Sequence, residues 1–141
     1  MINLLKIYVL IYSTKNISWY ELLPALSLGV FSVAVLNINN IRDIESDKLA
    51  GKFSVPVRLG RAQAVMYHWG LLISGVSFAL IYTILKYSTP WQLLFLLTLP
   101  LLIKNAMAVR QKPSHALDPY LKQMAITTLL FVLLFGLGLV L

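Results

Sequence analysis

Charge is scarce in this 141-residue chain, and cysteine is absent. Only 12% of the residues are charged, whereas 59% are hydrophobic, and the mean hydropathy is +0.80. A composition this apolar excludes a soluble globular domain. The absence of cysteine excludes disulfides, thiolate metal sites and a cysteine nucleophile.

The charged residues are also clustered, which leaves four long stretches without Asp, Glu, Lys or Arg: residues 22–41, 62–85, 87–103 and 123–141. A helix needs about 20 apolar residues to cross a hydrocarbon core of about 30 Å. Helix is expected because a chain in lipid must satisfy its own backbone hydrogen bonds. We therefore predict an all-α membrane protein, a polytopic helical bundle. Its four transmembrane helices are expected over residues 20–41, 62–85, 87–109 and 119–141, after a partial helix over residues 1–14.

The basic residues predict how the chain is oriented in the membrane. The segment 42–61 carries five of them and the segment 104–122 carries four, whereas the linkers 14–19 and 86–90 carry one each. Because cytoplasmic loops are enriched in Lys and Arg, the two basic segments are expected on the cytoplasmic side of the cell (inner) membrane. The net charge of +7 is therefore interpreted as a topology signal, and no nucleic-acid partner is expected.

Eight of the 17 charged residues fall in the cytoplasmic loop predicted over residues 42–61. Asn39, Asp43 and Asp47 are spaced four apart, so they would form one stripe on a helix that continues from the preceding span, with Asn40 beside them. Like charges at this spacing repel by about 0.2–0.5 kcal/mol. Mg²⁺ would compensate, because it prefers one or two carboxylates together with phosphate oxygens and water.

Taken alone, two aspartates four residues apart at a helix end more often form a solvated helix end than a metal site. With Mg²⁺ bound to the aspartates, the surrounding cations would face the anionic oxygens of a diphosphate. Arginine suits bidentate contact with phosphate oxygens, and lysine acts as a point charge. The candidate diphosphate contacts of this kind are Arg42, Lys48, Lys52 and Arg58.

The whole string from Asn39 to Gly60 closely resembles the second aspartate-rich motif of the UbiA-type intramembrane prenyltransferases. The shared elements are N-N-x-R-D-x-x-x-D over residues 39–47, G-K at 51–52 and V-R-L-G over 57–60. Within that superfamily the string is most similar to the 1,4-dihydroxy-2-naphthoate polyprenyltransferase branch of menaquinone synthesis.

The resemblance implies a bundle of nine transmembrane helices with two aspartate-rich motifs on cytoplasmic loops. The first motif, of the N-D-x-x-D kind, would follow the second helix, but the acids outside the second motif are only Glu21 and Asp118. We therefore expect the chain to correspond to the end of the fifth family helix and to helices six through nine. It would be the C-terminal half of an enzyme with a missing N-terminal half, through a fragmentary sequence, a split gene or a wrongly placed start, and inactive alone.

The resemblance further implies Mg²⁺-assisted departure of diphosphate from a polyprenyl diphosphate, followed by attack of a ring carbon of dihydroxynaphthoate. Asp43 and Asp47 would be the catalytic metal ligands. The substrate-binding residues for diphosphate would be Asn39, Asn40, Arg42, Lys48, Lys52 and Arg58. Tyr67 and His68 lie near the start of the next span, where anchoring in the membrane interface is favoured over contact with the aromatic substrate.

Two alternatives remain at this point. The chain could be another UbiA-type aromatic prenyltransferase, or a small non-enzymatic four-helix transporter or accessory subunit. Cation-coupled carriers usually place an ionisable residue inside a span. The four charge-free stretches contain no Asp, Glu, Lys or Arg, which favours a site at the membrane surface over a conduction path.

Overall fold

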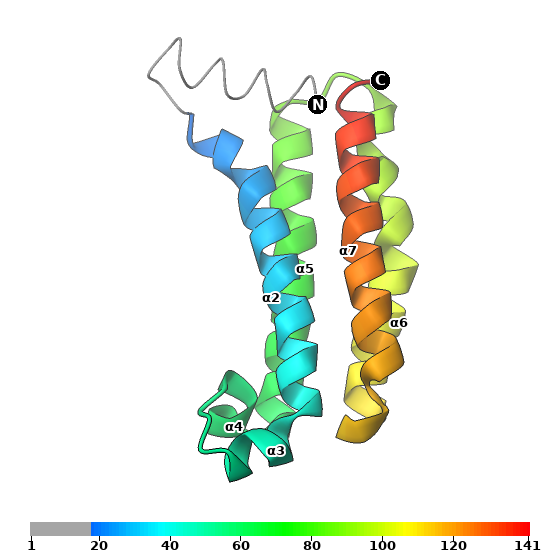
Figure 1. Ribbon diagram of the computed structural model, residues 1–141. Helices are drawn as coiled ribbons and strands as arrows, with labels where there is room; N and C mark the ends of the chain where they lie inside the picture. The colour runs from blue at the N-terminus through cyan, green and yellow to red at the C-terminus, as the bar shows by residue number, and fades with distance from the viewer. Residues whose placement is uncertain (1–17) are drawn as a thin grey trace.

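A computed structural model describes residues 18–141, and over these residues the chain is helical throughout, with turns and short loops between the helices (Figure 1). Four helical segments are long and apolar enough to cross a membrane: Trp19–Arg42, Arg61–Leu85, Pro90–Gln111 and Asp118–Gly138. The described residues thus confirm the predicted all-α membrane bundle. The partial helix predicted over residues 1–14 lies outside the described residues.

Two of these four segments, Trp19–Arg42 and Pro90–Gln111, each consist of a 3₁₀-helix followed by an α-helix. The order along the chain is η1 (Trp19–Leu22), α2 (Leu23–Arg42), α3 (Ile44–Leu49), α4 (Val55–Leu59), α5 (Arg61–Leu85), η2 (Pro90–Thr98), α6 (Leu99–Gln111), η3 (Ser114–Ala116) and α7 (Asp118–Gly138). Here η denotes a 3₁₀-helix. The bundle pairs α2 with α5 and α7 with the η2–α6 segment (Figure 1).

Proline sets both ends of the third long segment. The sequence places its start at residue 87, but the helix begins at Pro90, because the residue before a proline is driven into extended backbone and Thr89 has φ −140° and ψ 153°. Pro113 likewise drives Lys112 into extended backbone, so α6 ends at Gln111. Within the segment the 3₁₀-helix changes to α-helix at Leu99, next to Pro100, whose missing N–H interrupts the helical hydrogen bonding.

Polar side chains tie α2 to α5 at two levels. The Ser27 hydroxyl donates to the Gly75 carbonyl at 2.7 Å, and the Asn37 amide donates to the Ala64 carbonyl at 3.0 Å. Both side chains are buried, so each would cost free energy without such a partner. These two bonds, one near each end of α2, hold the helix in a fixed register against α5.

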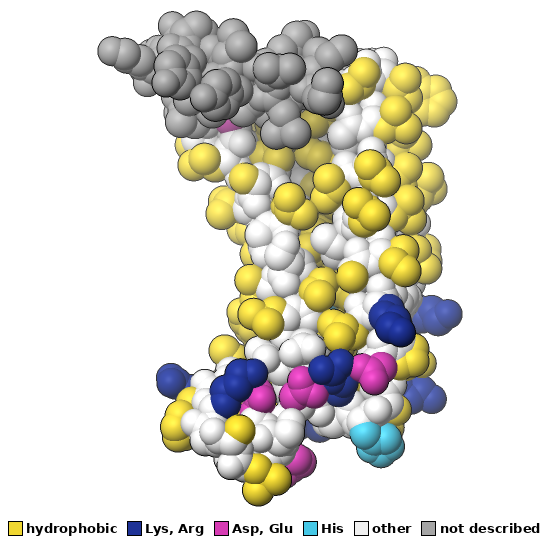
Figure 2. All heavy atoms as spheres, in the orientation of Figure 1, with side chains coloured by type: hydrophobic (Ala, Val, Ile, Leu, Met, Phe, Trp, Pro, Cys, Tyr) yellow, Lys and Arg dark blue, Asp and Glu magenta, His cyan; other side chains and the backbone are white. Residues whose placement is uncertain are grey.

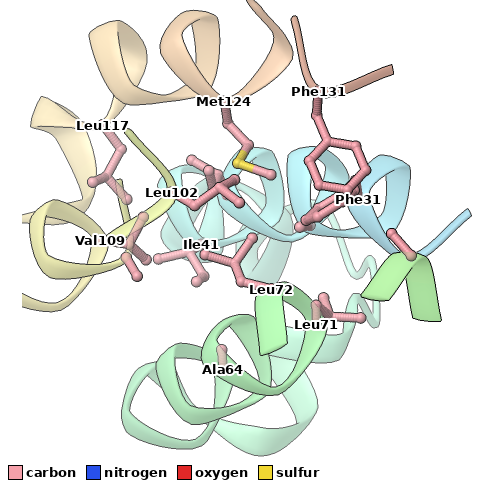
Figure 3. Packing of buried hydrophobic residues seen from close by; sticks show 14 of the residues in the cluster. Phe31, Ile41, Ala64, Leu71, Leu72, Leu102, Val109, Leu117, Met124 and Phe131 are labelled. Carbon is pink, nitrogen blue, oxygen red and sulfur yellow. The ribbon is translucent and has the colours of Figure 1, made fainter. Parts of the chain in front are cut away.

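Phenylalanine rings form the centre of the hydrophobic core, where α2, η2 and α7 meet. Phe31 and Phe131 lie edge to face with their ring centroids 4.6 Å apart (Figure 3). Phe95 meets Phe131 at 5.2 Å and Phe135 at 5.5 Å in the same manner. Such pairs add about 0.5–1.5 kcal/mol each beyond the area they bury. The cluster therefore joins the two helix pairs of the bundle.

Most of the surface of the spans is apolar. Between 33% and 44% of the most apolar window of each span is buried inside the bundle, and the other residues are partly or fully exposed. Figure 2 shows hydrophobic side chains along the length of the bundle and most of the visible charged side chains toward one end. Lipid is the environment that accepts such a surface, because exposed apolar patches of this extent are rare in soluble monomers.

Gly138 offers a test of the contact between α7 and η2. A Cβ atom at this position would clash with the Trp91 carbonyl oxygen and would lie 2.9 Å from the Gln92 Cα, which are backbone atoms that cannot turn aside. We expect Gly138→Ala to lower the free energy of unfolding by about 1–3 kcal/mol. Thermal denaturation in detergent micelles measures the effect.

The matched control is Gly136→Ala in the same helix, where a Cβ would meet nothing within 4 Å. This variant should leave the stability unchanged or raise it slightly, since alanine favours helix by up to about 1 kcal/mol over glycine. Equal melting temperatures for the two variants would show that α7 does not approach η2 this closely.

Candidate functional site

The charged side chains gather where α2 ends and the short helices α3 and α4 cross below the bundle (Figures 1 and 2). Two glycines shape this segment. Gly51 has φ 68° and follows α3, and Gly60 has φ 82° and separates α4 from α5. Glycine adopts such positive φ values without the steric cost that other residues pay. The chain can therefore turn back twice and remain beside the helix end.

The helix does not continue unbroken from α2 through Asp47, as the stripe predicted from the sequence requires. It bends at Asp43, which has φ −96° and ψ 11°, and α3 begins at the next residue. The Ser46 hydroxyl donates to the Asp43 carbonyl at 3.0 Å, a side-chain bond of the kind that competes with regular helix. The spacing survives the bend, because the Asp47 N–H still donates to the Asp43 carbonyl at 2.8 Å.

Arg42 is the hub of the charged cluster. Its Nε and Nη2 donate to the two carboxylate oxygens of Asp43 at 2.7 and 2.9 Å, a bidentate pair. Nη2 also donates to Asn39 Oδ1 at 3.0 Å, and Nη1 donates to Asp118 Oδ1 at 2.6 Å. The hydrogen-bonded Arg42 guanidinium, reinforced by the charge of Lys52, holds the pKa of Asp43 below its usual value. Asp43 is therefore an anion at neutral pH.

Asp47 lies in a different environment, because it is buried with 7% of its surface exposed. The Lys52 ammonium contacts Oδ1 at 3.2 Å, whereas Oδ2 is buried without a hydrogen-bond partner among the described residues. A buried carboxylate is costly unless both of its oxygens are satisfied. A carboxylate oxygen of this kind is chemically suited to coordinate a hard cation or to accept a hydrogen bond from water.

The structure brings together five of the eight residues that the sequence predicted for the site, in two groups. One group is Asn39, Arg42 and Asp43, and the other is Asp47 with Lys52. The remaining three, Asn40, Lys48 and Arg58, have no hydrogen bond to either group within residues 18–141. Lys48 Nζ lies 3.6 Å from Oε1 of the exposed Glu45, and Arg58 is exposed on α4.

The sequence did not identify two residues that frame this cluster. Asp118 is the first residue of α7 and pairs with Arg42 across 76 positions of the chain. Arg61 donates to the Ser114 hydroxyl at 2.8 Å, to the Val109 carbonyl at 3.0 Å and to the Lys112 carbonyl. Asp118 carried a signal, because it is the only acid in the basic segment 104–122. Arg61 gave no such signal in the sequence, because its partners are mainly backbone carbonyls, which every residue has.

The sequence interpretation of His68, which favoured anchoring in the membrane interface, is wrong. It is fully buried, and its Nε2 lies 3.2 Å from Asn105 Oδ1. The Asn105 amide nitrogen donates to the Tyr120 carbonyl at 2.8 Å and to Gln123 Oε1 at 3.2 Å, so Oδ1 faces the histidine and accepts from Nε2–H. His68 thus links α5 to α6 and α7 within the bundle, whereas its neighbour Tyr67 is exposed.

The described residues therefore define a polytopic α-helical membrane protein with carboxylate, guanidinium and amide groups clustered at one end. Comparison with known proteins gives the family: the model of the UbiA prenyltransferase family matches residues 4–129. This chain belongs to the UbiA prenyltransferase family, which confirms the resemblance drawn from the motif. No solved structure matches the chain.

Within the family, the chain is similar to relatives named as 1,4-dihydroxy-2-naphthoate octaprenyltransferases. The chain is 42% identical over 128 residues to a 1,4-dihydroxy-2-naphthoate octaprenyltransferase of Haemophilus influenzae, and 42% identical over 118 residues to the protein of that name from Escherichia coli. These matches cover 89% and 83% of this chain but 41% and 38% of the relatives. A protein of the same name from Mycobacterium tuberculosis is 34% identical over 120 residues, 84% of this chain and 40% of the relative.

Arg61 provides a test of how the loop before α5 is attached to the α6–α7 hairpin. We expect Arg61→Met to lower the free energy of unfolding by about 1–3 kcal/mol, because the last carbonyls of α6 lose a charged donor. Thermal unfolding in detergent measures the change. Arg110→Met, an exposed position on α6, is the matched control and should shift stability by about 0.5 kcal/mol or less. The same loss in both variants would contradict this function of Arg61.

Proposed function

We propose that this chain supplies one aspartate-rich half of an enzyme that transfers a polyprenyl group from polyprenyl diphosphate to 1,4-dihydroxy-2-naphthoate in menaquinone biosynthesis. The observation that carries the proposal is its 42% identity over 128 residues to a relative with that acceptor in its name. Family membership supports prenyl transfer over the transporter alternative. Because the chain spans about two fifths of these relatives, the activity is assigned to a larger assembly.

Mg²⁺ fits the residues at this end of the bundle. Asp47 Oδ2 is a buried carboxylate oxygen that has no partner in the part of the chain that the structure describes, and Asp43 is held in its ionised form by Arg42. Within residues 18–141 no three acidic or histidine side chains converge, so the protein would offer two carboxylates and leave the other positions to phosphate and water. Bound to Asp43 and Asp47, Mg²⁺ would neutralise charge that develops on the departing diphosphate.

The chain's own cations would take part in the same step. Lys52 already lies beside Asp47, so it can reach a phosphate held at this carboxylate. Lys48 and Arg58 are exposed and can turn toward an anion at low cost, whereas Asn39 and Asn40 lie on the last turn of α2 and can donate their amides. Fixed cations around a leaving group act most strongly in the transition state, where its charge is greatest.

The reaction proposed for the assembly breaks the bond between the allylic carbon and the diphosphate oxygen. The oxygen keeps the electron pair and leaves as diphosphate. The electron-rich ring carbon of dihydroxynaphthoate then forms a bond to the allylic cation, and the ring loses its carboxylate as carbon dioxide. A site at the membrane surface suits both substrates, because the prenyl chain can remain in lipid while the diphosphate remains in water.

We also propose that the charged end lies on the cytoplasmic side of the cell (inner) membrane. Both basic segments of the chain belong to this end: one joins α2 to α5, and the other joins α6 to α7. Their placement on one side of the bundle agrees with the enrichment of Lys and Arg in cytoplasmic loops.

The metal ligands can be tested by Asp43→Asn and Asp47→Asn, in membranes that also contain a segment supplying the family's first aspartate-rich motif. Each variant should lose prenyl transfer by at least about 100-fold, because a fixed charge that stabilises the leaving group is removed. Labelled prenyl diphosphate, dihydroxynaphthoate and Mg²⁺ provide the assay.

Glu45→Gln is the control for these variants, because Glu45 lies between the two aspartates but its side chain is 84% exposed. It removes the same charge and should change the rate by about twofold or less. Full activity in both aspartate variants would disprove their assignment as metal ligands.

The proposed need for the family's first aspartate-rich motif, in addition to the one in this chain, gives a separate prediction. Membranes with this chain as their only prenyltransferase component should show little or no product, since one motif would hold only part of the diphosphate. Coexpression with the segment that supplies the N-D-x-x-D motif should restore product. Robust turnover by the chain alone would contradict the proposed division of the site.

A further inference from the structure

Arg42 lies between two carboxylates that come from different parts of the fold. It holds both oxygens of Asp43 and, through Nη1, one oxygen of Asp118 at the start of α7. Asp118 lies within the α6–α7 hairpin, whose position is fixed by the fully buried Leu117 and by the bonds of Arg61 to the end of α6. The second carboxylate that Arg42 contacts, that of Asp118, is therefore held in place independently of the bend at Asp43.

This arrangement poses an electrostatic problem for the proposed metal site. A cation bound at Asp43 brings a second positive charge to oxygens that Arg42 already occupies. The two positive charges repel each other, so the contact of the guanidinium with Asp43 weakens, which is costly for a partly buried charge unless another anion holds it. Among the described residues, the only other carboxylate that contacts Arg42 is that of Asp118.

We propose that Asp118 is a positioning residue for the cation site: it retains Arg42 when Asp43 turns toward the metal, and thereby increases the affinity of the site for a divalent cation. The inference rests on the proposed function, because it requires a cation at Asp43 and Asp47. Asp118 itself neither ligates the metal nor touches the reacting atoms.

The expected effect is modest in size. The Asp118 side chain is 64% exposed, and ion pairs this accessible to water are screened. The geometry improves on an ordinary surface pair, since Asp43 and Asn39 already restrict the Arg42 side chain and little further entropy is lost. We expect Asp118→Asn to weaken divalent cation binding by about two- to fivefold.

The test measures Mn²⁺ binding to the full chain in detergent, with inorganic pyrophosphate present, by the electron paramagnetic resonance signal of the free ion. Asp118→Asn should bind Mn²⁺ more weakly than the wild type. Glu45→Gln, which removes one negative charge from a more exposed side chain with no contact to Arg42, should bind as the wild type does. Equal weakening in both variants would overturn the inference, because net charge alone would then explain it.

A double variant separates action through Arg42 from direct action of the Asp118 charge. In Arg42→Gln the cation has no competitor at Asp43, so adding Asp118→Asn should cause no further loss of Mn²⁺ binding. A further loss as large as that in the wild-type background would overturn the inference. Circular dichroism and the melting temperature of each variant verify that the bundle is folded in these comparisons.

Two further variants distinguish failure of this inference from failure of the proposed function. If Asp43→Asn and Asp47→Asn weaken Mn²⁺ binding but Asp118→Asn does not, only the inference about Asp118 is wrong. If the wild type binds no Mn²⁺ with pyrophosphate present, or if the two aspartate variants bind as well as the wild type, the metal site is wrong and the inference is disproved with it.

Discussion

The bidentate pair between Arg42 and Asp43 is the interaction on which the charged end of this bundle depends. It sits where the last turn of a membrane-spanning helix meets the polar loop, and there an unpaired charge would be costly. The guanidinium has donors to spare, so it also holds Asn39 and reaches Asp118 on α7. One side chain thus fixes the bend after α2 and connects it to a distant helix.

Two arginines attach the loop to the rest of the fold. Arg42 precedes the loop and Arg61 follows it, and both bind the connection between α6 and α7. Hydrophobic packing alone would leave such a loop free, because its exposed residues bury little apolar surface. The phenylalanine cluster holds the helices together, and the arginines orient the charged groups at their end.

Much of the architecture could be predicted from the sequence, because hydrocarbon permits few solutions. A charge-free stretch of about 20 residues must form a helix there, and its prolines determine where it can begin. The spacing of Asp43 and Asp47 with the V-R-L-G element was enough to indicate the family. The environment of each aspartate could not be predicted, since the bend that separates a half-buried Asp43, paired with Arg42, from a buried Asp47 arises from local side-chain bonds.

Sequence by itself determined the class of protein, the family and the end of the bundle where charge collects. Only the tertiary structure decided that His68 is a buried contact of Asn105, that Arg61 binds the end of α6 and that Asp118 shares Arg42 with Asp43. The physical reason is distance along the chain. Hydrophobicity and motif spacing are local properties, whereas these pairs join residues 37 to 76 positions apart and exist only once the helices pack.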